Sequence, residues 1–261
     1  MTELQVVLPD ESAAMSPERL VELAVAAEEL GYGTAWLPDH LLPPEPFGST
    51  YGGVYEPLVT IGYLAARTTR IRFGTSVLVL PLRSPYVVAK QAATLHRLSG
   101  ERLVLGVGAG WEATEFAAVG SAFQDRGRRT DESLAIIRSL FAGEDRDGVF
   151  EPKPRAPLPI MIGGTTTPAL RRAARFGDEW QGFNLDAAGF AAALARLREL
   201  SPGRPVQAGT RLDWSSGEPG PIVEAAHELA AAGAETIAIS FGDEQEALDR
   251  MTRFHALFTA A

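Results

Sequence analysis

The sequence predicts a closed (β/α)8 barrel, in which eight parallel strands alternate with helices. Eight short apolar runs follow one another along the chain, and a segment with helical periodicity follows most of them. The runs are continuous rather than alternating in polarity, which is typical of parallel strands covered on both faces. The length of 261 residues fits one barrel domain over 1–261. An open doubly wound sheet is the alternative, but no glycine-rich dinucleotide fingerprint follows the first run.

The first elements have clear boundaries. An apolar strand over 4–8 comes first, and leucines and alanines at helical spacing predict a helix over 17–30. Ser16 and Gly31 are typical residues for the start and the end of that helix. The apolar run 34–37 is the second strand.

The middle of the chain continues the alternation. Residues 57–68 are apolar nearly all round and are expected to form a buried helix. A long β-branched run predicts a strand over 71–80, followed by a helix over 85–98 and a strand over 102–107. The next helix is expected over 130–141, with the threonine at its first position as the cap.

The last part of the chain supplies four more strands. They are expected at 159–162, 178–183, 206–212 and 235–240. The helices that follow them are expected at 168–176, 187–200, 221–232 and 244–258. Glycines directly follow two of these helices, which is a common helix end.

The composition excludes several classes of protein. A formal net charge of −9 argues against nucleic acid and against an anionic membrane surface as partners, because both need a basic face. No apolar run approaches the ~20 residues of a spanning helix. The polar segment after Met1 does not look like a secretory signal, and the chain has no cysteine. We therefore expect a cytoplasmic protein that acts on a small molecule, without membrane or nucleic acid.

Asp39 and His40 directly follow the second strand. Burying such groups without partners costs about 2–7 kcal/mol even when they are neutral, so this strand ends either at a surface or at a site. Catalytic groups of (β/α)8 barrels lie at the carboxyl ends of the strands. A site is therefore our interpretation, and a structural ion pair between the two residues is the alternative.

Other strand ends carry unusual residues that would surround the same mouth. The small hydroxylated residues Thr75 and Ser76 interrupt the third strand just before Val77. The fourth strand ends in Gly106–Gly110 followed by Trp111, where missing side chains could make room for a flat ring or only permit a bend. Trp111 could form a wall of this site or fill the core.

The stretch 163–168, Gly-Gly-Thr-Thr-Thr-Pro, lies between a strand and a helix. Its glycines allow close backbone approach, and the start of the helix can bind an anion such as phosphate. A tight turn with a capping threonine is the structural alternative. No metal-ligand spacing and no Gly-x-Ser-x-Gly elbow is present, so we expect no metal and no serine hydrolase.

Four stretches closely resemble the bacterial luciferase-like monooxygenase superfamily, and in particular its coenzyme F420-dependent oxidoreductases of actinobacterial type. The resemblance runs from about residue 20 to residue 183. The stretches are ELGYGTAWLPDH at 29–40, residues 68–116, RGRRTDE at 126–132, and PIMIGGTTTPALRRAARFGDEWQGF at 159–183.

The resemblance implies a barrel that binds coenzyme F420, a deazaflavin, or alternatively FMN, at the carboxyl ends of its strands. Asp39 and His40 match the Asp-His pair of F420-dependent members, in which the histidine lies near the redox-active carbon. The peptide bond between Ser76 and Val77 matches a non-prolyl cis peptide that presses on the central ring. A homodimer is also implied.

Gly163, Gly164 and Thr165 match the family's contacts on the phosphate side. We also expect contacts to the coenzyme from Thr75 beside the cis peptide and from Gly108, Ala109, Gly110 and Trp111 at the fourth strand end. One departure concerns Trp111, because the sugar-phosphate dehydrogenases of this family have a catalytic glutamate there. Glu112 and Glu115 are nearby but not in register, which argues against a sugar-phosphate dehydrogenase.

The resulting hypothesis is hydride transfer between coenzyme F420 and a small organic substrate, with His40 as proton donor or acceptor and Asp39 orienting it or binding the ring edge. An FMN-dependent monooxygenase and a non-catalytic flavin- or deazaflavin-binding module are the alternatives. The loops 41–56 and 112–125 are expected to shape the substrate pocket, with Phe47, Tyr51 and Tyr55 as candidate wall residues.

Overall fold

The computed structural model describes residues 2–9, 15–144 and 148–260. Its strands form one parallel sheet in the order β3-β2-β1-β9-β8-β7-β6-β5-β4, and β3 also pairs with β5, which closes the sheet. β3 and β4 are two parts of one barrel strand, so the expected eight-stranded (β/α)8 barrel is confirmed. The strands are β1 Glu3–Val7, β2 Thr34–Leu37, β3 Arg72–Thr75, β4 Leu78–Val79, β5 Leu103–Gly108, β6 Ile160–Gly163, β7 Glu179–Phe183, β8 Gln207–Asp213 and β9 Thr236–Ser240.

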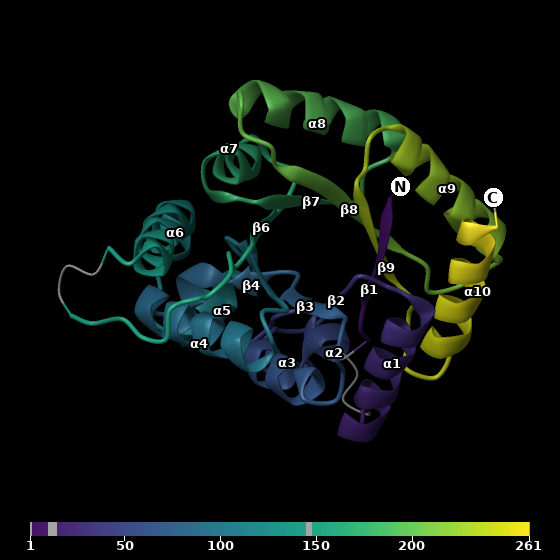
Figure 1. Ribbon diagram of the computed structural model, residues 1–261, viewed down its shortest axis with the longest axis horizontal. Helices are drawn as coiled ribbons and strands as arrows, with labels where there is room; N and C mark the ends of the chain where they lie inside the picture. The colour runs from purple at the N-terminus through teal and green to yellow at the C-terminus, as the bar shows by residue number, and fades with distance from the viewer. Residues whose placement is uncertain (1, 10–14, 145–147, 261) are drawn as a thin grey trace.

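The helices form an outer ring around the strands (Figure 1). They are α1 Pro17–Leu30, α2 Gly48–Tyr51, α3 Pro57–Ala65, α4 Pro85–Leu98, α5 Ala113–Ala118, α6 Arg126–Ala142, α7 Thr167–Phe176, α8 Ala187–Leu200, α9 Pro219–Ala231 and α10 Ala247–Thr259, with two short 3-10 turns, η1 Leu80–Leu82 and η2 Phe123–Asp125. Within the described ranges, no helix has both the length and the apolar character needed to cross a membrane.

The signals predicted for α1 act as expected. The Ser16 hydroxyl accepts a hydrogen bond from the Arg19 N–H at 3.1 Å. Gly31 ends the helix in the left-handed region at φ 92° and donates its N–H to carbonyls of the last turn. The buried face of the helix consists of small and branched apolar residues, namely Leu20, Leu23, Ala24 and Ala27.

α6 begins earlier than predicted. The sequence pattern places its start at Thr130, but the helix starts at Arg126, and the Thr130 hydroxyl donates to the Arg126 carbonyl inside it at 2.7 Å. The first turn is polar, so it carries no apolar periodicity. It is supported instead by ion pairs of the exposed Arg128 with Asp125 at 3.0 Å and Glu132 at 2.8 Å.

The predicted strand over 71–80 is interrupted at Ser76 and Val77. The peptide bond between these two residues is cis, as the family resemblance implies. The chain pairs again as β4 and then enters η1. Two stretches expected as loops also contain short helices, α2 within 41–56 and α5 within 112–125, and both lie beside the candidate site.

Two apolar cores hold the barrel. The larger one lies between the strands and the surrounding helices. The smaller one fills the barrel interior and consists of Val7, Trp36, Val104, Met161 and Ala238, with Val77 packed against it. Below, we call this second cluster the interior core.

Candidate active site

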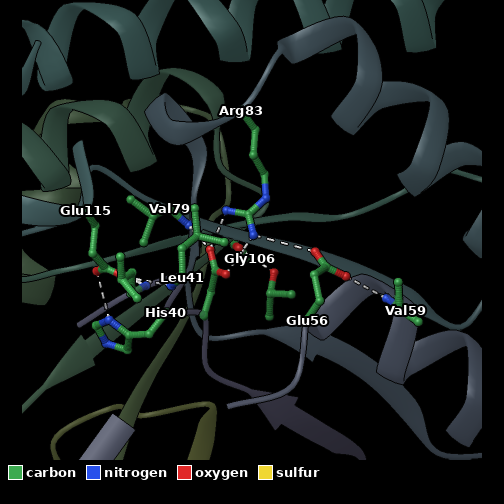
Figure 2. A network of polar contacts seen from close by, with 11 residues as sticks. His40, Leu41, Glu56, Val59, Val79, Arg83, Gly106 and Glu115 are labelled. Carbon is green, nitrogen blue, oxygen red and sulfur yellow. Dashed lines mark hydrogen bonds and ion pairs between the residues drawn. The ribbon is translucent and has the colours of Figure 1, made fainter. Parts of the chain in front are cut away.

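Asp39 is fixed in a buried ion pair at the end of β2. Its residue exposure is 3%. The Arg83 guanidinium donates to both carboxylate oxygens, at 2.7 and 2.8 Å, and the Val79 N–H donates to Oδ2 at 2.8 Å. Arg83 also faces Glu56 at 3.5 Å (Figure 2). Asp39 therefore ties the end of β2 to β4 and η1, beside the cis peptide.

His40 is held by a different carboxylate, that of Glu115 on α5. The His40 Nδ1 lies 3.0 Å from Glu115 Oε2, and Figure 2 shows the carboxylate facing the ring. Glu115 is 3% exposed, and its Oε1 accepts the N–H groups of Leu41 at 2.5 Å and Leu42 at 2.9 Å. The same carboxylate thus fixes the imidazole and the backbone that follows it.

Aromatic side chains surround the His40 ring. Tyr51 of α2 stacks on it, with ring centroids 4.8 Å apart and an angle of 18° between the planes. Trp111 meets it edge-on at 5.6 Å and 71°, and Phe47 in turn meets Trp111 at 4.6 Å. Trp111 is 49% exposed, so it lines the mouth of the barrel and does not fill the core.

The expectation that Asp39 orients His40 is wrong. No hydrogen bond joins the two side chains in the described structure, because both oxygens of Asp39 face Arg83 and Val79. Glu115 takes the orienting position. Sequence reasoning noted this glutamate but gave it no role, since only the three-dimensional position of α5 brings its carboxylate to the end of β2.

Two of the rim glycines make room for Val77. A Cβ at Gly108 would lie 2.5 Å from Val77 Cγ2, and a Cβ at Gly163 would lie 2.4 Å from Val77 Cγ1. At Gly106 a Cβ would lie 1.8 Å from the Thr75 carbonyl oxygen. Gly106 and Gly108 therefore accommodate the neighbouring strand, and the side chain of Val77 occupies the space between β5 and β6 at the mouth.

The hydroxyl groups of the interrupted strand are engaged within the protein. Thr75 Oγ1 donates to the Gly106 carbonyl at 2.5 Å, and Thr75 is fully buried. Ser76 bonds the Gln181 side chain at 2.6 Å. What this strand offers to a ligand is therefore its backbone and the Val77 side chain.

The predicted anion loop leads from β6 into α7. Gly164 has φ +118°, a conformation that side chains rarely adopt, and its carbonyl accepts the Trp180 indole N–H at 2.8 Å. The Thr166 hydroxyl accepts the Ala169 N–H at 3.4 Å and caps α7, whereas Thr165 is exposed. The ten-residue helix thus presents its positive end beside an exposed threonine and a pair of glycines.

Together these elements define a barrel with a polar and aromatic mouth at the carboxyl ends of β2 to β6. Residues 2–209 match the luciferase-like monooxygenase family. The chain belongs to this family, and the sequence resemblance is confirmed.

Relatives within the family differ in the activities that their names state. An uncharacterized protein of Mycobacterium tuberculosis is 36% identical over 203 residues, which cover 69% of this chain and 70% of that protein. An F420-dependent glucose-6-phosphate dehydrogenase of Amycolatopsis mediterranei is 35% identical over 176 residues. That match covers 62% of this chain but only 52% of the dehydrogenase, so this chain spans about half of that enzyme.

Solved structures share the fold over nearly the whole chain. An F420-dependent secondary alcohol dehydrogenase in complex with an F420-acetone adduct has a TM-score of 0.81 at 15% identity, covering 98% of this chain and 99% of the other. Monooxygenase RslO1 from Streptomyces bottropensis has a TM-score of 0.80 at 20% identity, covering 100% of both chains. At these identities the likeness concerns the fold alone.

Proposed function

We propose that this protein is a coenzyme F420-dependent oxidoreductase that transfers a hydride between the deazaflavin and a small organic substrate, with His40 as proton donor or acceptor. The observation that carries the proposal is the hydrogen bond between His40 Nδ1 and Glu115 at the end of β2. The F420-dependent relatives at about a third identity support the choice of coenzyme.

The pair of His40 and Glu115 suits general acid–base chemistry. A carboxylate that accepts the Nδ1–H fixes the tautomer of a neutral imidazole and leaves Nε2 as the base. It also stabilises the imidazolium that forms when Nε2 takes a proton. Nδ1 is the ring nitrogen with a hydrogen-bond partner among the described residues, so Nε2 is the atom for exchange with substrate. In the direction of oxidation it accepts the hydroxyl or amine proton, and in reduction it returns it.

The residues at the mouth fit a planar coenzyme with an anionic tail. Gly108 and Gly163 make room for the Val77 side chain, which would give the coenzyme ring an apolar surface to lie against. The backbone of 75–77 and 108–111 would hold the ring, with Trp111 and His40 beside it. Gly163, Gly164 and Thr165 would hold a phosphate at the start of α7.

When bound, the deazaflavin would supply the hydride chemistry. The protein would position the coenzyme and the substrate, shield them from water and exchange a proton with the substrate. Asp39 is assigned a supporting role in this proposal. Its ion pair with Arg83 holds the β2 end against β4, and so sets the distance between His40 and the Ser76–Val77 backbone.

An FMN-dependent monooxygenase is the second candidate, because the family carries that activity in its name and the fold matches monooxygenases equally well. The site also fits a module that binds the coenzyme without catalysis. The pairing of a histidine with a buried carboxylate favours an enzyme, since a carrier needs no proton exchange.

The experiment is a titration of the purified protein with F420 and with FMN, followed by a turnover assay. We expect F420 to bind at least about tenfold more tightly and reduced F420 to be oxidised by some acceptor of an alcohol–ketone or enone panel. His40→Ala should bind F420 as the wild type does and lose turnover. Tighter binding of FMN, together with oxygen consumption, would identify the protein as an FMN-dependent monooxygenase instead. Binding of F420 without any hydride transfer would identify it as a non-catalytic binding module.

A further inference from the structure

Arg211 of β8 points into the barrel. The bond between Ser76 and Gln181 joins strands that are not neighbours in the sheet, so it crosses the interior and places Gln181 inside. In the register of β7 and β8, Gln181 pairs with Gly209 and Phe183 with Arg211. Because alternate residues of a strand share a face, Arg211 lies on the same inner face as Gln181.

The register of β8 with β9, its other neighbour, also places Arg211 on the inner face of the barrel. Arg211 pairs with Ala238 of β9, which belongs to the interior core. The adjacent Leu212 packs against the outer core between the strands and the helices. Arg211 therefore stands above the interior core, near the carboxyl ends of the strands.

The charge of Arg211 has no partner in the described chain. Its Nε is buried without a hydrogen-bond acceptor, and the side chain forms no ion pair with any carboxylate among the described residues. Asp213, two residues on and on the same face, is exposed and does not form an ion pair with it. The contact that the side chain does make is with the Phe183 ring, whose centroid lies 5.5 Å from Cζ.

Two other arginines of low exposure are paired with carboxylates. Arg83 has the bidentate contact to Asp39, and Arg172, at 7% exposure, bonds Asp131 at 2.6 Å. Taking a guanidinium partly out of water without a counterion is costly. A bound anion would supply the missing charge.

We propose that Arg211, flanked by Phe183, forms a subsite for an oxyanion, a carboxylate or a phosphate group, carried by the organic substrate. The guanidinium fork matches the geometry of these groups and cannot lose its charge. Phe183 is 50% exposed and supplies an apolar surface next to the charge. That the anion belongs to the substrate rests on the proposed function, whereas the binding of an anion at Arg211 does not.

The position of Arg211 on β8 would allow this subsite to orient the substrate relative to His40. β8 is separated from β2 by β9 and β1 on one side and by the interrupted strand, β5, β6 and β7 on the other. A substrate whose anionic end is held at Arg211 therefore reaches across the mouth toward His40. Its reacting carbon would lie between the two, which would fix which end of the molecule meets the coenzyme.

The test uses the apo protein, inorganic phosphate and succinate as probes, and calorimetry at low ionic strength. The wild type should bind at least one of the two anions. Arg211→Met and Arg211→Gln should weaken that binding by about tenfold or more, and Arg211→Lys by less, because it keeps the charge without the fork. Arg198→Met removes the same charge from an exposed position on α8 and should leave the affinity unchanged.

Two further measurements separate this role from others. Because Arg211 has no acidic partner among the described residues, Arg211→Gln in anion-free buffer should melt at or above the wild-type temperature, and a lower melting temperature would make Arg211 structural. Binding of F420 and of its chromophore without the phosphate and glutamate tail should be the same in wild type and variant. A loss confined to F420 would assign Arg211 to the coenzyme tail and overturn the proposal.

An absence of anion binding to the wild type, or equal binding to Arg211→Met, would also overturn it. If F420 does not bind at all while anion binding depends on Arg211, the proposed coenzyme is wrong and the subsite stands.

Discussion

Glu115 Oε2 lies 3.0 Å from His40 Nδ1, although 75 positions separate the two residues in the chain. The same carboxylate receives the N–H groups of Leu41 and Leu42 through its other oxygen. α5, a helix of only six residues, therefore determines the orientation of the imidazole at the end of β2. The barrel strand places His40 at the mouth, and the loop after β5 supplies its carboxylate.

Replacing Glu115 by Gln tests whether this contact sets the tautomer of His40. A glutamine can still accept the backbone N–H groups, but its amide donates toward Nδ1, so the proton moves to Nε2 and the base is lost. We expect turnover to fall by about 10²-fold or more, with the dissociation constant of F420 unchanged. Steady-state kinetics measure turnover, and a binding titration measures the dissociation constant of F420.

Glu112→Gln is the matched control, because it changes the same residue type in the same loop at a position whose carboxylate only caps α5. It should keep nearly full turnover. Combining Glu115→Gln with His40→Ala should cost no more than His40→Ala alone, since the carboxylate acts through the imidazole. A double variant that loses much more would show that Glu115 contacts substrate or coenzyme itself.

The ion pair of Asp39 and Arg83 predicts a stability effect. Arg83→Met would leave a carboxylate of 3% exposure with only the Val79 N–H. Removing one partner of a buried pair costs about 3–5 kcal/mol, so the free energy of unfolding should fall by that amount in urea or guanidinium titrations.

Arg128→Met is the control for that variant. Arg128 is 59% exposed and pairs with Asp125 and Glu132 on the surface of α6, where a pair contributes about 0–1 kcal/mol. If both variants lose equally little stability, Asp39 is not held by Arg83 in solution.

The sequence predicts most of the fold, because the signals that define the barrel are local. The apolar runs, Ser16 and Gly31 each act through their immediate neighbours, and the structure uses them as expected. The start of α6 is one exception, since its first turn is held by exposed ion pairs of Arg128 that leave no apolar pattern.

The candidate site is less accessible to sequence reasoning, because its contacts join distant segments. The strand order identifies His40 as a rim residue, and the resemblance supplies the cis bond after Ser76. The partner of His40 depends on where α5 lies, and the pairing of Asp39 with Arg83 depends on the path of η1. Neither position follows from periodicity.

Gly163 and Val77 are predicted to be coupled. A Cβ at position 163 would lie 2.4 Å from Val77 Cγ1, so Gly163→Ala must displace the Val77 side chain. Overpacking of this kind costs about 1–3 kcal/mol. Val77→Ala removes the clashing methyl group, so the double variant should be more stable than the sum of the two single effects by about 0.5–3 kcal/mol.

Gly62→Ala serves as the control for that cycle. Gly62 lies inside α3, and an added Cβ makes an ordinary van der Waals contact, 3.5 Å from Leu95 Cδ1. Alanine there should raise stability by about 0.5–1 kcal/mol through helix propensity. If the stability effects of Gly163→Ala and Val77→Ala are purely additive, the structure around the mouth relaxes to accept both side chains, and the two positions are not coupled.

Glu28 predicts how stability depends on pH. Burial alone raises its pKa, but the backbone N–H groups of Ile71, Arg70 and Thr69 donate to its carboxylate and together lower the pKa to about 2. In the unfolded chain the group has its ordinary pKa of 4.5. The contribution of Glu28 is therefore fully present above pH 4.5 and is lost as the pH falls from 4.5 toward 2.

Glu28→Gln should lower the free energy of unfolding at pH 7 by about 1.5–3 kcal/mol, the range for hydrogen bonds to a charged group. The difference between variant and wild type should shrink in denaturant titrations between pH 4.5 and 2.5, whereas Glu29→Gln, an exposed neighbour on α1, should show a small difference throughout. A difference that stays constant down to pH 2.5 would mean that the charge of Glu28 does not clamp the start of β3.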